Sequence, residues 1–189
     1  KGFKNTTIEN HNAYFKQILK WANERGYLKH GEEVIKHKVK KLKVIDPKAV
    51  NYLHWDEFLL LYNYEFDELH KDWELARDRF CFCCLTSLRH SDLSVLKKSC
   101  FDNPDDPTSF TFVSKKTDDN LTIYLNEMSK KIYMKYKDIP TENGLLFPTK
   151  SGDNMRRCLK NIAKALNIDR EITITRYCGD RRIDEPIKL

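Results

Sequence analysis

An arginine stands at position 89, directly after a long apolar stretch and just before Ser91-Asp92, a pair typical of a helix start. A guanidinium beside the free backbone N–H groups of a helix N-terminus can bind a phosphate. Arginines near helix ends also often pair with an acidic residue at the surface. Position 89 taken alone leaves both interpretations open.

Two adjacent lysines, Lys115 and Lys116, begin a polar, turn-rich segment. The runs on either side, 109–114 and 121–125, alternate between apolar and polar residues, a pattern that predicts a β-hairpin with these lysines at its tip.

Six cysteines are present, and three of them lie in the apolar stretch Cys81–Cys84 among Phe and Leu. A zinc site needs paired Cys or His ligands, usually in loops at suitable spacing. Cysteines with apolar neighbours are more typical of buried thiols that pack as small hydrophobic groups. We therefore expect no metal.

The chain has 189 residues, of which 40% are hydrophobic and 33% charged, as in a soluble globular protein. No apolar run approaches the roughly 20 residues needed to span a bilayer. The first residues lack the apolar stretch of a signal peptide. We expect no membrane partner and a cytoplasmic location.

The net charge of +6 is unevenly distributed. Residues 1–50 hold 12 Lys/Arg against 5 Asp/Glu, a net charge of +7, whereas residues 51–189 have a net charge of −1. This asymmetry favours a polyanionic partner for the first quarter of the chain, with a solvated basic surface as the alternative. The candidate contacts are Lys36, Lys38, Lys40, Lys41 and Lys43.

The N-terminal apolar pattern predicts an amphipathic helix that ends at Gly26, with Thr6 and Glu9 as a capping box. Asp46-Pro47 breaks the chain, so we place a linker at about 38–50. Further helices are predicted from Trp55, over 72–86, from Ser91 (as N-cap) to Leu96, over 126–137 and over 153–167. A short strand is predicted over 171–175. The expected fold is α+β and mainly helical, with a small β-sheet or hairpin.

The stretch 86–93 resembles the first catalytic box of the tyrosine recombinase (phage integrase) family, commonly Thr-Gly-Leu-Arg-x-Ser-Glu/Asp-Leu. Thr86, Leu88, Arg89 and Asp92 match that box, as do Ser91 and Leu93. Ser87 replaces the usual glycine. Glycine at that place permits an unusual backbone angle that serine tolerates less well.

Further similarities to the family follow in order along residues 10–175. Lys116-Thr117 is similar to the family's hairpin lysine, and Leu146-Phe147-Pro148 with 159–163 and Ile168 resembles the "LFP … L-K-x-I-A" stretch of mobile-element integrases. The segment 14–27 looks like the end of the core-binding domain. The resemblance implies residues 1–45 as the C-terminal part of that helical DNA-binding domain, with the basic linker to about 50. It implies 51–189 as the N-terminal part of the catalytic domain.

The resemblance implies DNA strand exchange through a 3′-phosphotyrosyl intermediate, without metal or cofactor. Arg89 is then the first of the family's two arginines, and Lys116 protonates the leaving 5′-oxygen, with Lys115 as the alternative. Asp92 supports the box through a helix cap or a contact to Arg89, or is an ordinary acidic residue at a helix start. The implied partner is double-stranded DNA, with self-association on DNA in the full-length parent.

The family's second box, His-x-x-Arg, and its later nucleophilic tyrosine have no match in this chain. No histidine follows the hairpin, and Tyr177 lies in a segment similar to the one that precedes the second box, so we expect a strand tyrosine there. We therefore expect a truncated integrase that binds DNA at most and is itself inactive. A non-catalytic DNA-binding regulator of the same fold is the main alternative, and a helical protein-interaction module is a third.

Overall fold

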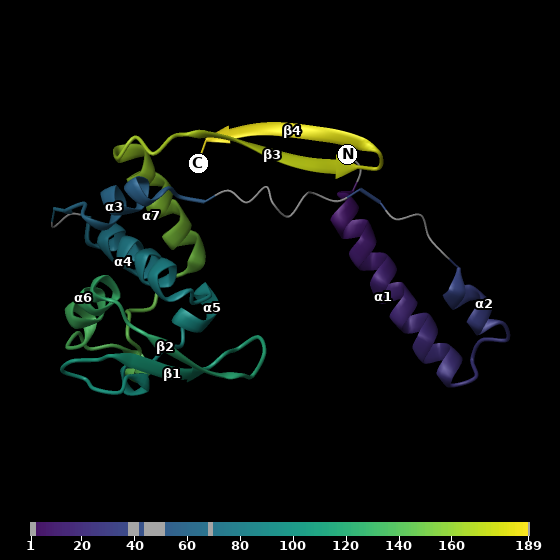
Figure 1. Ribbon diagram of the computed structural model, residues 1–189, viewed down its shortest axis with the longest axis horizontal. Coiled ribbons are helices and arrows are strands. Elements are labelled where there is room, and N and C mark those ends of the chain that lie inside the picture. The colour runs from purple at the N-terminus through teal and green to yellow at the C-terminus, as the bar shows by residue number, and fades with distance from the viewer. Residues whose placement is uncertain (1–2, 38–41, 44–51, 68–69, 189) are drawn as a thin grey trace. The chain divides into compact units, whose positions relative to one another are not determined.

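The computed structural model describes residues 3–37, 42–43, 52–67 and 70–188. They divide into two compact units, which are coloured along the chain in Figure 1. The terminal unit comprises residues 1–52 with 170–189, and the central unit comprises residues 53–169. No helix within the described residues is both long enough and apolar enough to cross a membrane.

The terminal unit combines two helices with a long hairpin. Helix α1 (Asn5–Glu24) packs against α2 (Gly31–Lys36). Strands β3 (Glu171–Cys178) and β4 (Arg181–Lys188) pair antiparallel in a register that runs from Glu171↔Lys188 to Cys178↔Arg181. The sequence predicted only the first half of β3. Its partner β4 was not predicted, because a proline and five charged residues hide its strand pattern.

Asn5 joins α1 to the turn of that hairpin. Its side chain is almost fully buried, and Nδ2 donates to the carbonyl oxygens of Lys43 and Gly179, both at 2.7 Å. Its Oδ1 accepts from the backbone N–H of Gly179, also at 2.7 Å. Gly179 has φ +61°, a left-handed conformation that suits glycine in a tight turn. One amide thus holds three segments of the terminal unit together.

The start of α1 differs from the prediction. The helix begins at Asn5 with Lys4 as N-cap, and no side chain caps it, so the expected capping box of Thr6 and Glu9 is wrong. Instead, Oε1 of Glu9 accepts from the backbone N–H of Leu42 at 2.9 Å. The carboxylate satisfies a distant backbone donor in place of the one at the helix start. The helix ends as predicted, with Gly26 at φ +72° just beyond it.

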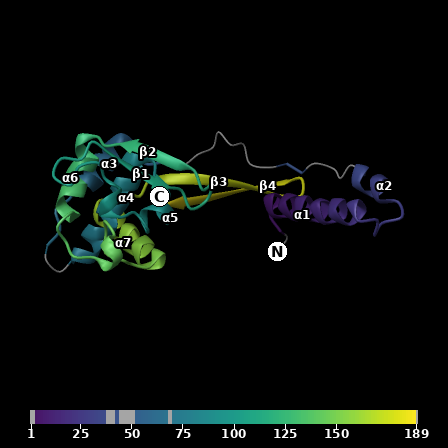
Figure 2. The same cartoon turned by 90° about the horizontal axis from the view of Figure 1, so that it is seen from below.

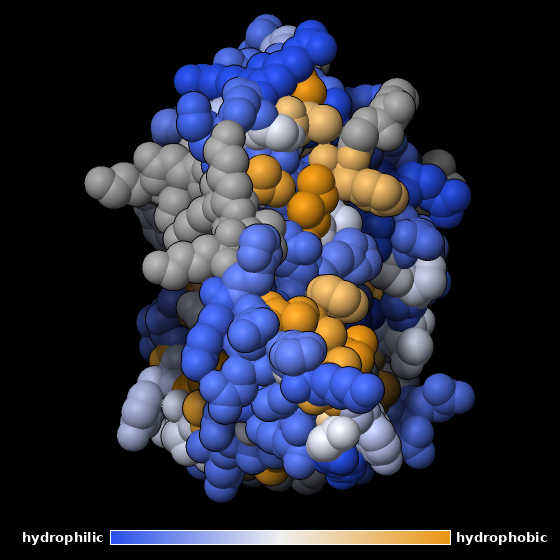
Figure 3. Space-filling view, turned by 90° about the vertical axis from the view of Figure 1, so that its right-hand side faces the viewer, coloured by the Kyte–Doolittle hydropathy of each residue, from blue (hydrophilic) through white to orange (hydrophobic). Residues whose placement is uncertain are grey.

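Apolar side chains remain exposed along α1. Tyr14, Ile18 and Trp21 follow one another at helical spacing, and each has at least half of its surface exposed. Figure 3, which views the molecule from the side of Figure 1 where α1 and α2 lie, shows hydrophobic patches among polar surface. The guanidinium of Arg25 lies over the ring of Trp21, with its Cζ 4.4 Å from the ring centroid.

The central unit is built around α4 (Lys71–Thr86), which contacts α3, α5, α6 and α7. Figures 1 and 2 show α4 between the β1–β2 hairpin on one side and α7 on the other. The remaining elements are α3 (Trp55–Tyr62), α5 (His90–Leu93), η2 (Lys98–Cys100), β1 (Ser109–Val113), β2 (Asn120–Tyr124), α6 (Glu127–Tyr136), η3 (Glu142–Gly144) and α7 (Gly152–Ala165).

Aromatic rings fill the core between α4, β1 and α6. The ring of Phe82 lies 5.7 Å from that of Phe147 and 6.1 Å from that of Phe110, measured between centroids. The ring centroids of Phe101 and Tyr133 lie 4.2 Å apart. Rings at these separations and tilted to one another gain about 0.5–1.5 kcal/mol per pair beyond burial. This core supports the base of the β1–β2 hairpin.

The α+β, mainly helical fold is confirmed, as is the hairpin over Ser109–Tyr124. Helices over 72–86, 126–137 and 153–167 are confirmed to within a residue or two. The helix from Ser91 to Leu96 is wrong in both length and start. Helix α5 covers four residues, and Arg89 rather than Ser91 is its N-cap. The chain turns away after Leu93 because Leu96 is buried and its carbonyl accepts from Leu146 N–H at 2.8 Å.

Arg77 on α4 closes the C-terminal end of α3. Its guanidinium is buried, and Nη1 donates to the carbonyl oxygens of Tyr62 at 2.6 Å and Tyr64 at 2.7 Å. A helix end leaves such carbonyls without partners inside the helix. The arginine supplies the missing donors, and its Nε pairs with the carboxylate of Asp78.

Asp78 in turn connects α4 to α6. Its Oδ2 accepts from Nζ of Lys135 at 2.7 Å and from the hydroxyl of Tyr136 at 2.8 Å. Burial, followed by the charge of Asp78, raises the pKa of the Tyr136 hydroxyl, which therefore stays a donor at all ordinary pH values. The buried carboxylate is thus matched by one guanidinium, one ammonium and one hydroxyl.

We predict that Asp78→Ala lowers the free energy of unfolding by about 3–5 kcal/mol, because it removes the closest charge partner of the buried guanidinium of Arg77 and leaves only Glu74, at 3.9 Å. Asp105→Ala is the matched control, since Asp105 forms a 3.0 Å ion pair with Lys137 while itself almost fully exposed. That change should cost about 0–1 kcal/mol. Urea unfolding followed by circular dichroism measures both, and equal losses would contradict the role given to Asp78.

Candidate functional site

Arg89 follows the C-terminus of α4 and caps the short helix α5. Its backbone is extended, with φ −71° and ψ 147°, and its carbonyl accepts from the N–H groups of Asp92 and Leu93, both at 3.0 Å. About half of the side chain, 53%, is exposed. The guanidinium is therefore anchored by a fixed backbone while its charge faces solvent.

Asp92 links this arginine to the hairpin. Its carboxylate is 3% exposed, with Oδ2 3.9 Å from Nη1 of Arg89 and Oδ1 accepting from the backbone N–H of Lys115 at 3.0 Å. Nη1 of Arg89 also donates to Oγ of Ser114 at 3.4 Å. One buried carboxylate thus contacts both the arginine and the hairpin turn. The contact to Arg89 that the sequence left as one of three possibilities for Asp92 is present.

The hairpin turn itself carries the two lysines. The N–H of Ser114 donates to the carbonyl of Asp119, and the N–H of Asp118 donates to the carbonyl of Ser114, both at 2.9 Å. Lys115 and Lys116 lie in the turn between these bonds, and both are exposed. Neither forms an ion pair within the described part of the chain. Their ammonium groups are available to a ligand.

Asp102 fixes the other end of the hairpin, a role that the sequence analysis did not identify. Its carboxylate accepts from the backbone N–H groups of Thr108 at 3.0 Å and Ser109 at 3.1 Å, and from both hydroxyls. These bonds hold the pKa of the carboxyl well below its usual range. The turn-rich sequence 102–108 was the available signal, since Asp often bonds to the backbone of its own loop.

Ser87 confirms what its departure from the family's box suggested. It is the C-cap of α4 and has φ 57° and ψ 19°, in the left-handed region where a side chain is strained. Glycine is the usual residue at such a helix end. The serine keeps the backbone path that brings Arg89 to the start of α5.

The proposed DNA-binding lysines belong to the terminal unit. Lys38, Lys40 and Lys41 lie outside the described residues. Lys36 is exposed and pairs with Glu32 at 2.9 Å, four residues away on α2. Lys43 is exposed as well. Their contacts with DNA stay a prediction.

The cysteines are free thiols in the structure. Burial raises the pKa of the Cys83 thiol to about 12 and that of Cys81 further, so neither becomes a thiolate at neutral pH. Among the described residues no group of three His, Cys, Asp or Glu side chains lies close enough to hold a metal ion. Tyr177 lies half-buried in β3, as a strand tyrosine.

A buried acidic residue joins an arginine after a long helix to the tip of a two-stranded hairpin within a mainly helical α+β fold. Two solved structures align with most of this chain. The solved structure of a lambda integrase dimer bound to a COC′ core site aligns with a TM-score of 0.51 and 16% identity. A crystal structure of XerA recombinase aligns with a TM-score of 0.49 and 17% identity.

The lambda integrase alignment supports the fold and nothing beyond it. The alignments cover 93% and 90% of this chain, but only 50% of the lambda integrase chain and 64% of the XerA chain. No family model matches the sequence. No curated protein matches it either.

We predict that Ser87→Gly raises the free energy of unfolding of the chain by about 0.5–1 kcal/mol. Glycine removes a left-handed strain of about 1–2 kcal/mol and loses about 0.5–1 kcal/mol of chain entropy. Ser94→Gly is the control, because Ser94 lies at φ −65° and should lose stability instead. Urea unfolding measures the stability of both variants, and a loss of stability in Ser87→Gly would contradict the claim that the backbone is strained at Ser87.

Proposed function

We propose that this chain is part of a site-specific DNA recombinase and supplies two of its catalytic groups, the guanidinium of Arg89 and the ammonium of Lys116. The observation that carries the proposal is the position of Asp92, which contacts Arg89 on one side and the backbone of the hairpin turn on the other. A phosphate placed at Arg89 then lies within reach of a lysine from that turn. Lys115 is the alternative donor, since its own backbone N–H makes the contact.

The chemistry suits these residue types. A tyrosine hydroxyl gives its proton to a base and attacks the DNA phosphorus, the bond to the 5′-oxygen breaks, and that oxygen takes a proton from an acid. Negative charge gathers on the non-bridging oxygens in the transition state, where an arginine remains charged and can bond to two oxygens at once. Lysine can donate the proton to the leaving oxygen. Asp92 would then position Arg89 and the hairpin and would not touch the phosphate.

The family's tyrosine and its second His-x-x-Arg box have no match in this chain. We therefore propose that the chain alone binds DNA without cleaving it, and that strand exchange belongs to a parent that carries those residues. The lambda integrase in the aligned structure is a dimer bound to its core site. By that analogy we propose double-stranded DNA as the partner, with self-association of the parent on DNA. A non-catalytic regulator of the same fold is the alternative.

The proposed function predicts what happens when the proton donor of such a parent is removed. Lys116→Ala should lower cleavage of ordinary DNA by about 10²–10⁴-fold, because the 5′-oxygen then leaves without a proton. A substrate whose scissile 5′-oxygen is replaced by sulfur has a leaving group that needs no proton, so the variant should cleave it nearly as fast as the unchanged protein. The yield of covalent protein–DNA adduct measures both.

Lys115→Ala is the matched control, and it should cleave both substrates at nearly normal rates. If Lys115→Ala shows the sulfur-dependent rescue instead, the proton donor is Lys115. If neither lysine variant is rescued, the hairpin does not supply the acid. Arg89→Ala should lose cleavage of both substrates, since its charge stabilises the phosphate oxygens and not the leaving group.

A further prediction concerns DNA binding by the chain itself. Its affinity for a duplex of roughly 30 base pairs, followed by fluorescence anisotropy, should fall steeply with salt, because each lysine or arginine on a phosphate releases counterions. Arg89→Ala should reduce the slope of log K against log salt by about 1. Lys131→Ala removes an exposed charge from α6, outside the site, and should leave the slope unchanged. A slope near zero in the unchanged chain would contradict DNA binding.

A further inference from the structure

Arg79 on α4 is a buried cation to which the described residues offer no counter-charge. Its side chain is 3% exposed, and Nη1 donates to the carbonyl oxygen of Pro148 at 3.1 Å. Its Nε has no hydrogen-bond partner among the described residues. No carboxylate among the described residues forms an ion pair with Arg79. Burial accordingly lowers the pKa of this guanidinium.

The contrast with Arg77, two residues earlier on the same helix, shows what is missing. Arg77 is equally buried but pairs with the carboxylate of Asp78 and with carbonyl oxygens at the end of α3. A buried charge without such a partner is costly. Arg79 is thus a position where an anion would relieve an unfavourable charge.

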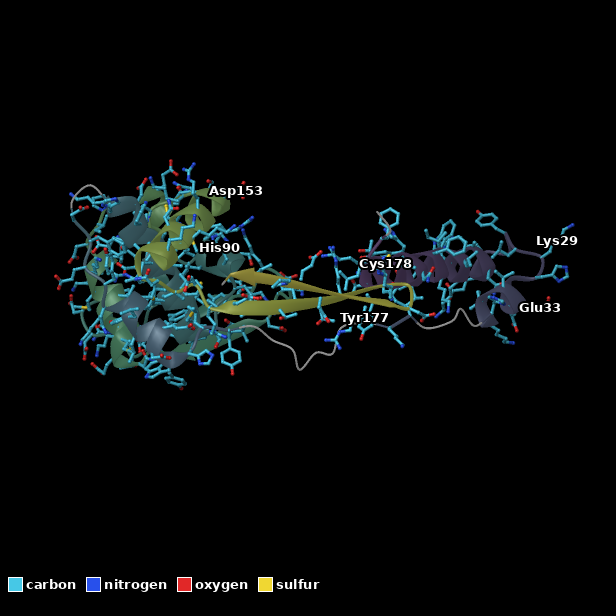
Figure 4. All side chains as sticks on the ribbon, turned by 90° about the horizontal axis from the view of Figure 1, so that it is seen from above. Lys29, Glu33, His90, Asp153, Tyr177 and Cys178 are labelled. Carbon is cyan, nitrogen blue, oxygen red and sulfur yellow. The ribbon has the colours of Figure 1, made fainter. Side chains whose placement is uncertain are left out.

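Two basic side chains lie against the start of α7, whose N-cap Ser151 follows three residues after Pro148, the residue that accepts from Arg79. Cε1 of His90 is 3.7 Å from the point that a Cβ on Gly152 would occupy, and Nη2 of Arg156 is 4.0 Å from the same point. Burial and the charges of Arg79 and Arg156 lower the pKa of the His90 imidazole. Figure 4 shows His90 and Asp153 at the same end of the central unit.

The first turn of α7 adds backbone donors. This helix has 14 residues, and Ser151 caps it by accepting from the N–H of Asn154 at 3.2 Å. The N–H groups ahead of Asn154 have no partner within the helix and point toward its start. Asp153 is the acidic residue there, and its Oδ1 pairs with Nη1 of Arg156 at 3.3 Å. With His90 neutral, the two arginines still leave one positive charge in excess.

We propose that Arg79, His90, Arg156 and the N-terminal turn of α7 form a binding site for a phosphate group, beside the Arg89 site and distinct from it. The phosphate would supply the counter-charge that Arg79 lacks, accept hydrogen bonds from the exposed Arg156 and from the helix N-terminus, and favour the protonated form of His90. On the proposed function, the occupant is a backbone phosphate of duplex DNA away from the scissile position. A free phosphate ion has the same chemistry.

The charged groups around His90 make the coupling between phosphate binding and protonation of His90 testable. Arg79 from α4 and Arg156 from α7 act on its imidazole, and Arg156 also pairs with Asp153. Arg89 and Asp92 are its neighbours in the sequence around α5. An anion between the two arginines reverses the effect of their charges on the imidazole. The pKa of His90 should therefore rise when phosphate binds, and phosphate should bind more tightly at pH 6 than at pH 8.

The test follows the Cε1–H resonance of His90 in the unchanged chain by NMR, across a pH series with and without inorganic phosphate. Phosphate should raise the pKa of His90 by about one unit. Arg156→Gln should weaken phosphate binding at least about tenfold. Arg157→Gln is the matched control, since Arg157 is also exposed but bonds to Asn154 at 3.3 Å, and it should leave the affinity unchanged.

Arg79→Met removes the buried charge at similar length and should weaken phosphate binding as well. If that variant fails to fold, Arg156→Gln on the exposed face decides alone. A His90 pKa that does not respond to phosphate, or equal losses in the Arg156 and Arg157 variants, would overturn the proposal.

A second arm separates the sources of the phosphate. If duplex DNA shifts the His90 resonance and Arg156→Gln lowers the salt slope of DNA binding by about 1, the occupant is a DNA phosphate. If inorganic phosphate shifts His90 but DNA neither shifts it nor competes, the site takes the free ion. DNA binding that depends on Arg89 while His90 responds to neither ligand would refute this site and leave the proposed recombinase function standing.

Discussion

The carboxylate of Asp92 is the interaction on which the site depends. It is buried, yet its two oxygens serve different elements: one faces the guanidinium of Arg89, and the other accepts from the backbone of Lys115. A carboxylate inside a protein is tolerated only when charges and donors surround it. Because both partners are needed, the loop after α4 and the turn between β1 and β2 are held at a common position, and a ligand at Arg89 meets the hairpin tip.

Other carboxylates of the central unit hold its elements in the same way. Asp78 joins α4 to α6 through Lys135 and Tyr136, and Asp102 closes the loop below β1. Each is matched by donors from a second element. Arg79 in the interior and the lysines of the hairpin turn at the surface have no such match among the described residues, and we assign ligands to them as well as to Arg89 and Arg156.

The sequence predicted elements whose pattern is local. Apolar spacing located α4, α6 and α7, and alternation with a polar turn located the β1–β2 hairpin. The order of the matching motifs indicated the fold that the lambda integrase comparison supports. The replacement of glycine by Ser87 indicated a left-handed residue. Each of these depends on neighbours within a few positions.

The sequence predictions were wrong or incomplete where contacts between distant residues determine the local structure. Glu9 leaves the helix start to bond to Leu42, and α5 stops after four residues because Leu96 turns into the core. Strand β4 forms by pairing with β3. The role of Asn5 depends on its hydrogen bond with Gly179, which is distant in the sequence. Arg89, Asp92 and the hairpin lysines were identified through the family resemblance. The charge environment of Arg79 could not be read from the sequence, because an unpaired Nε is a property of packing.

The most direct test of the account measures hydrogen exchange at the backbone amide of Lys115. In the unchanged chain this N–H donates to the buried carboxylate of Asp92, so it should exchange slowly for a residue in an exposed turn. In Asp92→Ala it should exchange at least about tenfold faster, while the amides of the β3–β4 hairpin keep their rates. An exchange rate at Lys115 that is fast in the unchanged chain, or that does not change in the variant, would contradict the claim that Asp92 holds the hairpin tip beside Arg89.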